Sequence, residues 1–327
     1  MLAFSGIREM MPKNQTLVDA VTSSPWSPER LIVSSLYCFT SVIGILMYVV
    51  FLMVANEAGF APAFRVLVKQ LAIADIGILS LCPLVYVPMT LTGRPIFGSS
   101  VLSTVLASFD GLWWFALEFT SLLIALNRFG ALMANRFGDW AFKRHLRSFM
   151  ASAWIVAVAF TIAPSAKFLP NIYTITYVCS PLPTNCSTVH YVSRKIVMRA
   201  NGVWVWCVCG CIIALYICIY VQLHVRQARS QSIVQFTDVQ ARRRHKRELQ
   251  MLAQGCVIGL TLTAVLLTFW AIYTWNLQSR YLGVGMTLAV TLNSCVNPVI
   301  YYIYNRRVRK NILRMFGAGN YESADTV

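Results

Sequence analysis

Long apolar stretches separated by short polar segments dominate this chain of 327 residues. A helix of about 20 apolar residues crosses the hydrocarbon core of a bilayer. Lipid offers the backbone no hydrogen-bond partners, so spanning segments of this kind should be helical. The pattern therefore predicts an all-α membrane protein with a seven-transmembrane helix bundle. The predicted spans are Leu31–Val54, Val66–Leu91, Ser100–Phe129, Phe149–Leu169, Gly202–Val225, Leu249–Leu277 and Tyr281–Tyr304.

A different pattern follows the seventh stretch in Asn305–Phe316, NRRVRKNILRMF. On a helix, Ile312, Leu313 and Phe316 share one face. The basic side chains between them are long enough to reach lipid headgroups. We expect a short amphipathic helix that lies on the inner membrane surface.

The basic residues are distributed unevenly between the polar segments. With the N-terminus outside, the inner segments hold 19 Lys and Arg residues and the outer segments hold 9. The positive-inside rule favours this orientation. The glycosylation sequons at Asn14 and Asn185 then both lie outside. We expect a multi-pass plasma-membrane protein with an extracellular segment (1–30), a membrane domain (31–304) and an amphipathic helix with a cytoplasmic tail (305–327).

Composition supports the membrane class and excludes two others. The chain is 57% hydrophobic and 12% charged, about half the charge of a usual soluble domain. Its net charge of +16 gathers between the apolar stretches, which is typical of loops that face anionic lipid. Nucleic-acid recognition motifs are absent from the sequence. We therefore expect membrane lipid, and no nucleic acid, as a partner.

Cysteine usage and motif content argue against metal and catalytic chemistry. Eight of the ten cysteines lie in apolar stretches, where cysteine behaves as a small apolar residue. The group Cys207, Cys209 and Cys211 lacks metal-site spacing. The sequence contains no zinc-protease, nucleophile-elbow or phosphate-loop motif. We expect no metal, no cofactor and no enzymatic activity. Cys179 and Cys186 fall in an outer segment, where an oxidising compartment would allow a disulfide.

Ionisable residues within the third stretch are the first candidates for function. Asp110 and Arg128 are 18 residues apart, which is five helical turns and about 27 Å along one face. One helix would thus hold a carboxylate near the outer membrane surface and a guanidinium at the inner one. Ionisable groups at membrane depth usually mark functional sites. Glu118 lies two turns inward of Asp110, and the sequence assigns it no role.

Near the inner end of the seventh stretch, Asn297-Pro298-Val299-Ile300-Tyr301 resembles the NPxxY motif of rhodopsin-like G-protein-coupled receptors. Pro298 removes a backbone hydrogen bond and distorts the helix. Four further matches occur in the family's order along the chain: Leu71 to Asp75, Asn127-Arg128-Phe129, Trp154 with Pro164, and Phe269-Trp270.

A narrower resemblance is to the class x serpentine chemoreceptors of nematodes. It rests on Gln70 to Asp75, Val87 to Thr90, Ala125 to Phe129 and Glu248 to Gln254. This resemblance implies a chemosensory receptor that transmits binding of a small extracellular ligand to a heterotrimeric G protein.

The resemblance also implies roles for individual residues. The candidate ligand contacts are Asp110, Trp113, Trp114, Trp270 and Tyr273; Trp204 and Trp206 are further aromatic candidates. The candidate residues for activation and G-protein coupling are Asn127, Arg128, Phe129, Asn297, Pro298 and Tyr301. The candidate ion or water site consists of Asp75 and Ser294 beside Asn297.

Each role has a structural alternative. Asp110 could pair internally rather than with a ligand, Asp75 could be a packed hydrogen-bonded group, and the tryptophans could be packing or membrane-interface residues. At the level of the whole chain, the alternatives are an amine or peptide receptor of the same fold, a receptor-like protein that no longer signals, and a secondary transporter. A transporter would predict inverted repeats and broken helices, and neither is evident.

Four departures from the larger family bear on mechanism. Ile45 follows Gly44 where that family usually has Asn, and no Pro follows Trp270. Ser103 stands near the place of the third-helix cysteine, so Cys179 and Cys186 are predicted to pair with each other. Asn127 replaces an acid beside Arg128, which removes the usual ion pair. We therefore expect ligand-independent signalling.

Overall fold

The computed structural model describes residues 27–92, 100–133, 137–165, 188–233, 255–268, 271 and 280–317, and all regular structure in these ranges is helical. The elements are α2 (Pro28–Val54), α3 (Pro62–Leu81), the π-helical η3 (Cys82–Tyr86), α4 (Val87–Thr92), α5 (Ser100–Met133), α6 (Phe137–Ser165), α7 (Thr188–Ile233), the Gly255–Thr268 helix, α9 (Arg280–Tyr304) and α10 (Arg306–Met315). Each of the seven predicted spans coincides with helix where it is described.

Five of these helical segments are long and apolar enough to cross a membrane: Pro28–Val54, Pro62–Thr92, Phe109–Ala131, Val203–Val225 and Val284–Tyr304. Gly255–Thr268 is a shorter apolar helix. α6 covers the predicted fourth span as far as Ser165. The predicted all-α membrane architecture is confirmed.

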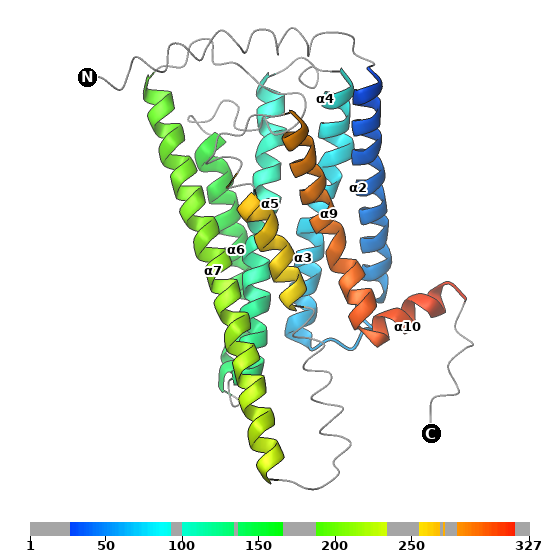
Figure 1. Cartoon of the computed structure of the whole chain (residues 1–327), viewed down its shortest axis with the longest axis vertical. Helices are drawn as coiled ribbons and strands as arrows, with labels where there is room; N and C mark the ends of the chain where they lie inside the picture. Colours follow the sequence, from blue (N-terminus) through cyan, green and yellow to red (C-terminus); the bar gives the residue numbers. More distant parts are fainter. Residues whose placement is uncertain are drawn as a thin grey trace.

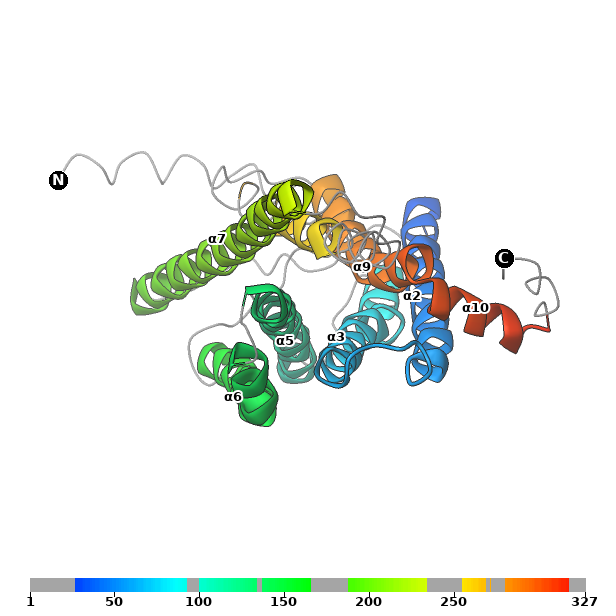
Figure 2. The same cartoon turned by 90° about the horizontal axis from the view of Figure 1, so that it is seen from below.

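The helices form one bundle around α5 and α3 (Figures 1 and 2). α5 packs against α3, α6 and α7, while α2 packs against α3 and α9. α10 leaves the end of α9 at a steep angle (Figure 1) and contacts both α9 and α2. Its first turn is capped by Asn305, whose side chain accepts hydrogen bonds from the backbone N–H groups of Arg307 and Val308 at 3.0 and 3.2 Å. The predicted helix after the last span is confirmed.

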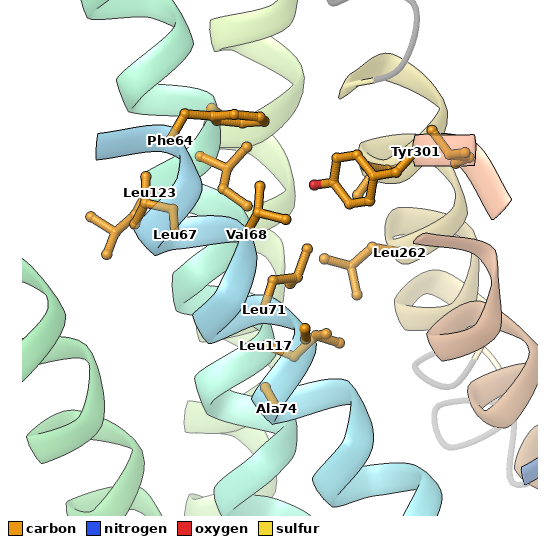
Figure 3. Packing of buried hydrophobic residues seen from close by; sticks show 14 of the residues in the cluster. Phe64, Leu67, Val68, Leu71, Ala74, Leu117, Leu123, Leu262 and Tyr301 are labelled. Atoms are coloured by element: carbon orange, nitrogen blue, oxygen red, sulfur yellow. The ribbon is translucent and has the colours of Figure 1, made fainter. Parts of the chain in front are cut away.

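Polarity is inverted relative to a water-soluble protein. Asp75 and Glu118 are fully buried inside the bundle, whereas Phe39 and Ile155 on its outer surface are 66% and 68% exposed. An outer surface of this kind suits lipid. Apolar side chains need no hydrogen-bond partners there, whereas polar groups would lose theirs. The interior is closed by an apolar cluster that joins α3, α5, α9 and the Gly255–Thr268 helix (Figure 3).

Two elements differ from the predicted spans. The second span, expected as Val66–Leu91, contains the π-helical turn Cys82–Tyr86 with Pro83 near its start. Proline has no backbone N–H to donate, which favours a local change of helical hydrogen bonding. α7 extends beyond both ends of Gly202–Val225, because only the apolar middle of a helix is limited by bilayer thickness.

Candidate functional site

The first polar site lies in the middle of the bundle and is called the Asp75 centre here: Asp75, Tyr48, Asn297 and Ser294. The Asn297 side-chain amide donates to Oδ2 of Asp75 at 2.8 Å, and the Tyr48 hydroxyl donates to the same oxygen. Ser294 also interacts with this carboxyl group. However, the Ser294 hydroxyl and the Asp75 Oδ1 atom are buried without a protein partner in full hydrogen-bonding geometry. Asp75, Ser294 and Asn297, which were expected to lie together, therefore do lie together in the structure.

Tyr48 is the member of the Asp75 centre that the sequence analysis missed. It lies on α2, three residues after Ile45. Ile45 itself stands at the position where the larger family has Asn. A side chain at Gly44 would begin 2.5 Å from the Cys295 sulfur and 2.9 Å from Leu79. The glycine therefore lets α2 come close to α3 and α9, which brings the Tyr48 hydroxyl within reach of Asp75. A polar ring in an otherwise apolar stretch was the available signal.

A second polar site lies nearer the start of α5. The half-buried Asp110 interacts through its carboxylate with the side chain of Tyr86. Tyr86 ends the π-helical turn that begins at Cys82, and the Cys82 sulfur lies 3.4 Å from the Thr291 hydroxyl of α9. π-Helical turns inside α-helices often occur at functional sites. The turn thus connects α5, through the contact of Tyr86 with Asp110, to α9, through the contact of Cys82 with Thr291.

Of the predicted aromatic ligand contacts, Trp113 is engaged in packing. A Cβ atom at Gly77 of α3 would lie 2.2 Å from its ring, so the glycine makes room for the indole. The ring also meets Trp154 of α6 edge-on at 5.8 Å between centroids. Trp154 in turn donates to Gln70 at 3.1 Å. These contacts favour the packing alternative for Trp113.

Near the C-terminal end of α5 lies the Arg128 cluster: Arg128, Phe51, Phe60, Phe64 and Tyr301. Arg128 is only 9% exposed, and its guanidinium carbon lies 4.9 Å from the centroid of the Phe64 ring. All three guanidinium nitrogens are buried without a hydrogen-bond partner among the described residues. This arrangement is a cation–π contact in which the N–H donors of the guanidinium are not used.

Tyr301 connects this cluster to the seventh-helix motif. Its ring stacks on Phe51 at 5.0 Å and meets Phe60 edge-on at 5.9 Å, and Phe60 meets Phe64 at 5.4 Å. Figure 3 shows the Tyr301 hydroxyl pointing from α9 toward α3, which carries Phe64 and Val68. That hydroxyl is also buried without a partner. The sequence analysis singled out Tyr301 and missed the contacts between these rings.

Of the remaining predicted residues, Trp114 and Trp204 are half-buried and Trp206 is exposed. Asn127 and Phe129 are half-buried next to Arg128, and Pro298 is buried inside α9. The others lie outside the described residues or have no described side chain there: Asn14, Asn185, Cys179, Cys186, Ser103, Trp270 and Tyr273.

The arrangement of these helices is that of a seven-helix membrane receptor. Squid rhodopsin has the same fold: its crystal structure matches with a TM-score of 0.66 at 15% sequence identity, covering 89% of this chain and 87% of that chain. The profile of the family described as serpentine type 7TM GPCR chemoreceptor Srx matches residues 38–305. The chain therefore belongs to the Srx family of serpentine chemoreceptors, which decides against the transporter alternative.

Proposed function

We propose that this G-protein-coupled receptor binds a small extracellular ligand near Asp110 and passes the signal to a heterotrimeric G protein at the Arg128 cluster. The observation that carries the proposal is that α5 holds two polar sites, one toward each end of the helix. Asp110 beside Tyr86 occupies one end, and Arg128 with its open hydrogen-bond donors occupies the other. A shift of α5 relative to its neighbours would affect both ends.

The ligand end suits a small molecule that carries a cationic or hydrogen-bond-donating group. A carboxylate in a low-dielectric site attracts such a group strongly, and Tyr86 adds a neutral hydroxyl group beside it. We propose Asp110 and Trp114 as ligand contacts, with Trp270 and Tyr273 as further candidates. Trp113 is assigned to packing because of its contacts with Gly77 and Trp154.

The partner end suits a segment that supplies hydrogen-bond acceptors. Arg128 offers guanidinium donors in a fork geometry, and Tyr301 adds a hydroxyl from α9. Carbonyl groups at a helix C-terminus have the matching chemistry, since they lack partners within their own helix. Asn127, Phe129, Asn297 and Pro298 are proposed to shape this end of the bundle.

We propose in addition that the Asp75 centre holds water or a monovalent cation. Support comes from Asp75 Oδ1 and the Ser294 hydroxyl, which are buried next to one another without full hydrogen bonds. Buried polar groups of this kind usually bind water or an ion.

The test of the proposed function is a screen of small volatile and water-soluble compounds for G-protein activation in cells. Arg128→Ala is expected to abolish activation while surface expression persists, because the partner loses its donors. Arg147→Ala is the matched control, since Arg147 is an exposed arginine on the neighbouring α6. An Arg128→Ala receptor that reaches the surface and signals like the parent would refute the assignment.

The proposed orientation, with an extracellular N-terminus in the plasma membrane, has its own test. Support comes from the 19 basic residues on the inner segments against 9 on the outer ones. An N-terminal epitope should be stained on intact cells, and Asn14→Gln should remove a glycan. Staining that requires permeabilisation would reverse the orientation.

A further inference from the structure

Glu118 is a buried carboxylate for which neither the family resemblance nor the proposed signalling route has a use. It lies on α5 between Asp110 and Arg128, and its side chain is completely buried. A carboxylate at this depth is expensive unless its environment supplies hydrogen bonds. The contacts of Glu118 therefore indicate what it does for the bundle.

Those contacts are two tryptophans. The indole N–H of Trp204, on α7, donates to Oε2 of Glu118 at 2.7 Å, a charge-assisted hydrogen bond between the two helices. Trp114, one turn earlier on α5, also interacts with the carboxylate. The Trp204 ring packs on Phe119 with centroids 4.7 Å apart. One carboxylate thus fixes the orientation of two indoles, one from each helix.

The second oxygen of Glu118 is open. Among the described residues, Oε1 of Glu118 is buried without a hydrogen-bond partner, and so is the hydroxyl of Thr263 on the Gly255–Thr268 helix. Cys209 of α7 lies against both Glu118 and Thr263. The carboxylate therefore stands where α5, α7 and the Gly255–Thr268 helix converge, with one oxygen engaged and one open.

We propose that Glu118 is a positioning residue that fastens α7 to α5 through Trp204 and holds Trp114 in place beside the ligand site. The proposal rests on the proposed function for its effect on signalling. Without the carboxylate, two indole N–H groups lose their acceptor. α7 then loses this hydrogen bond to α5, which favours the signalling population.

The direct test is the indole N–H resonance of Trp204 in the purified, ¹⁵N-tryptophan-labelled receptor. The resonance is identified by its loss in Trp204→Phe, a variant that keeps a ring against Phe119. Glu118→Leu should move it upfield, because the indole no longer donates to a carboxylate, and Glu118→Gln should move it less. A Trp204 resonance that is unchanged in Glu118→Leu would overturn the proposal.

The signalling test uses ligand-independent G-protein activation at equal surface expression. Glu118→Leu should raise it by roughly threefold or more, and Glu118→Gln, which keeps an acceptor, should stay close to the parent. Trp204→Phe should raise it to a similar extent, with no further rise in the double variant. Tyr220→Phe, at an exposed ring on the same helix, is the control and should change nothing.

Equal effects of Glu118→Leu and Glu118→Gln would overturn the positioning role. If Glu118→Leu does not fold, Trp204→Phe alone decides: a parent-like level of signalling then contradicts the proposal. If the parent receptor activates no G protein, the proposed function is wrong, and the predicted effect of Glu118 on signalling is wrong with it. The resonance test still decides whether Glu118 fastens the two helices.

Discussion

The Asp75 centre and the Arg128 cluster are both buried, yet they treat their charged groups in opposite ways. Asp75 is provided with donors from two other helices, Tyr48 of α2 and Asn297 of α9. Arg128 is provided with an aromatic face, Phe64, and its three nitrogens have no hydrogen-bond partner. A group satisfied by the fold stabilises the fold, whereas a group left open is suited to a partner from outside. The first site should therefore control stability, and the second should control signalling.

The largest expected effect on stability is that of Asp75→Leu. The substitution leaves the Tyr48 hydroxyl and the Asn297 amide buried without their acceptor, at a cost of about 2–5 kcal/mol. Thermal unfolding of the purified receptor in detergent should show a marked fall in Tm. Asp75→Asn, which keeps an acceptor in the same place, is the control and should cost less. Equal Tm values for Asp75→Leu and the parent would show that the centre does not hold the helices together.

The next effect is on signalling and concerns Phe64. A cation–π contact with a buried ring is worth about 0.5–2 kcal/mol. Phe64→Leu should therefore raise ligand-independent G-protein activation by roughly two- to thirtyfold, since about 1.4 kcal/mol corresponds to a factor of ten. Phe60→Leu changes a ring of the same cluster and is the control, with a smaller expected rise. If the two variants raise the activity equally, the aromatic face does not hold Arg128.

Asn127→Asp should have the smallest effect. It restores an acid beside Arg128, and an ion pair near the membrane surface is worth only about 0–1 kcal/mol. Ligand-independent activation, normalised to surface expression, should fall by less than about fivefold. Because the ring of Phe64 already holds the guanidinium, the effect should be larger in a Phe64→Leu background. An increase in activity in either background would contradict this account.

The helices were predictable because the bilayer imposes a length and an apolar composition that can be recognised in a single sequence. The meeting of Asp75, Ser294 and Asn297 was predictable only through the family resemblance. Tyr48 was not, since its reach depends on the close approach of α2 at Gly44. The π-helical turn at Cys82–Tyr86 was missed although Pro83 was visible, because proline in a membrane helix permits several local geometries.

The ring contacts around Arg128 could not be predicted from the sequence, for a related reason. The absence of an acid at Asn127 indicates that an ion pair is lost, so that less holds the guanidinium inward. The structure adds a contact that the sequence does not indicate, because the face of Phe64 lies 4.9 Å away. An aromatic residue in an apolar stretch has the same appearance in sequence whether it faces lipid, a neighbouring helix or a cation.

The most direct test of the contrast between the two sites is thermal unfolding of Arg128→Ala with and without G protein. The partner is the nucleotide-free heterotrimer that the parent activates in cells. Without it, the variant should unfold within about 2 °C of the parent, because the lost contact with Phe64 is offset by removal of a buried cation that makes no hydrogen bond. With it, the parent should be stabilised, as a ligand of the folded state must do, and the variant should not. An Arg128→Ala receptor that unfolds as early as Asp75→Leu, or that is stabilised by G protein as the parent is, would contradict the account.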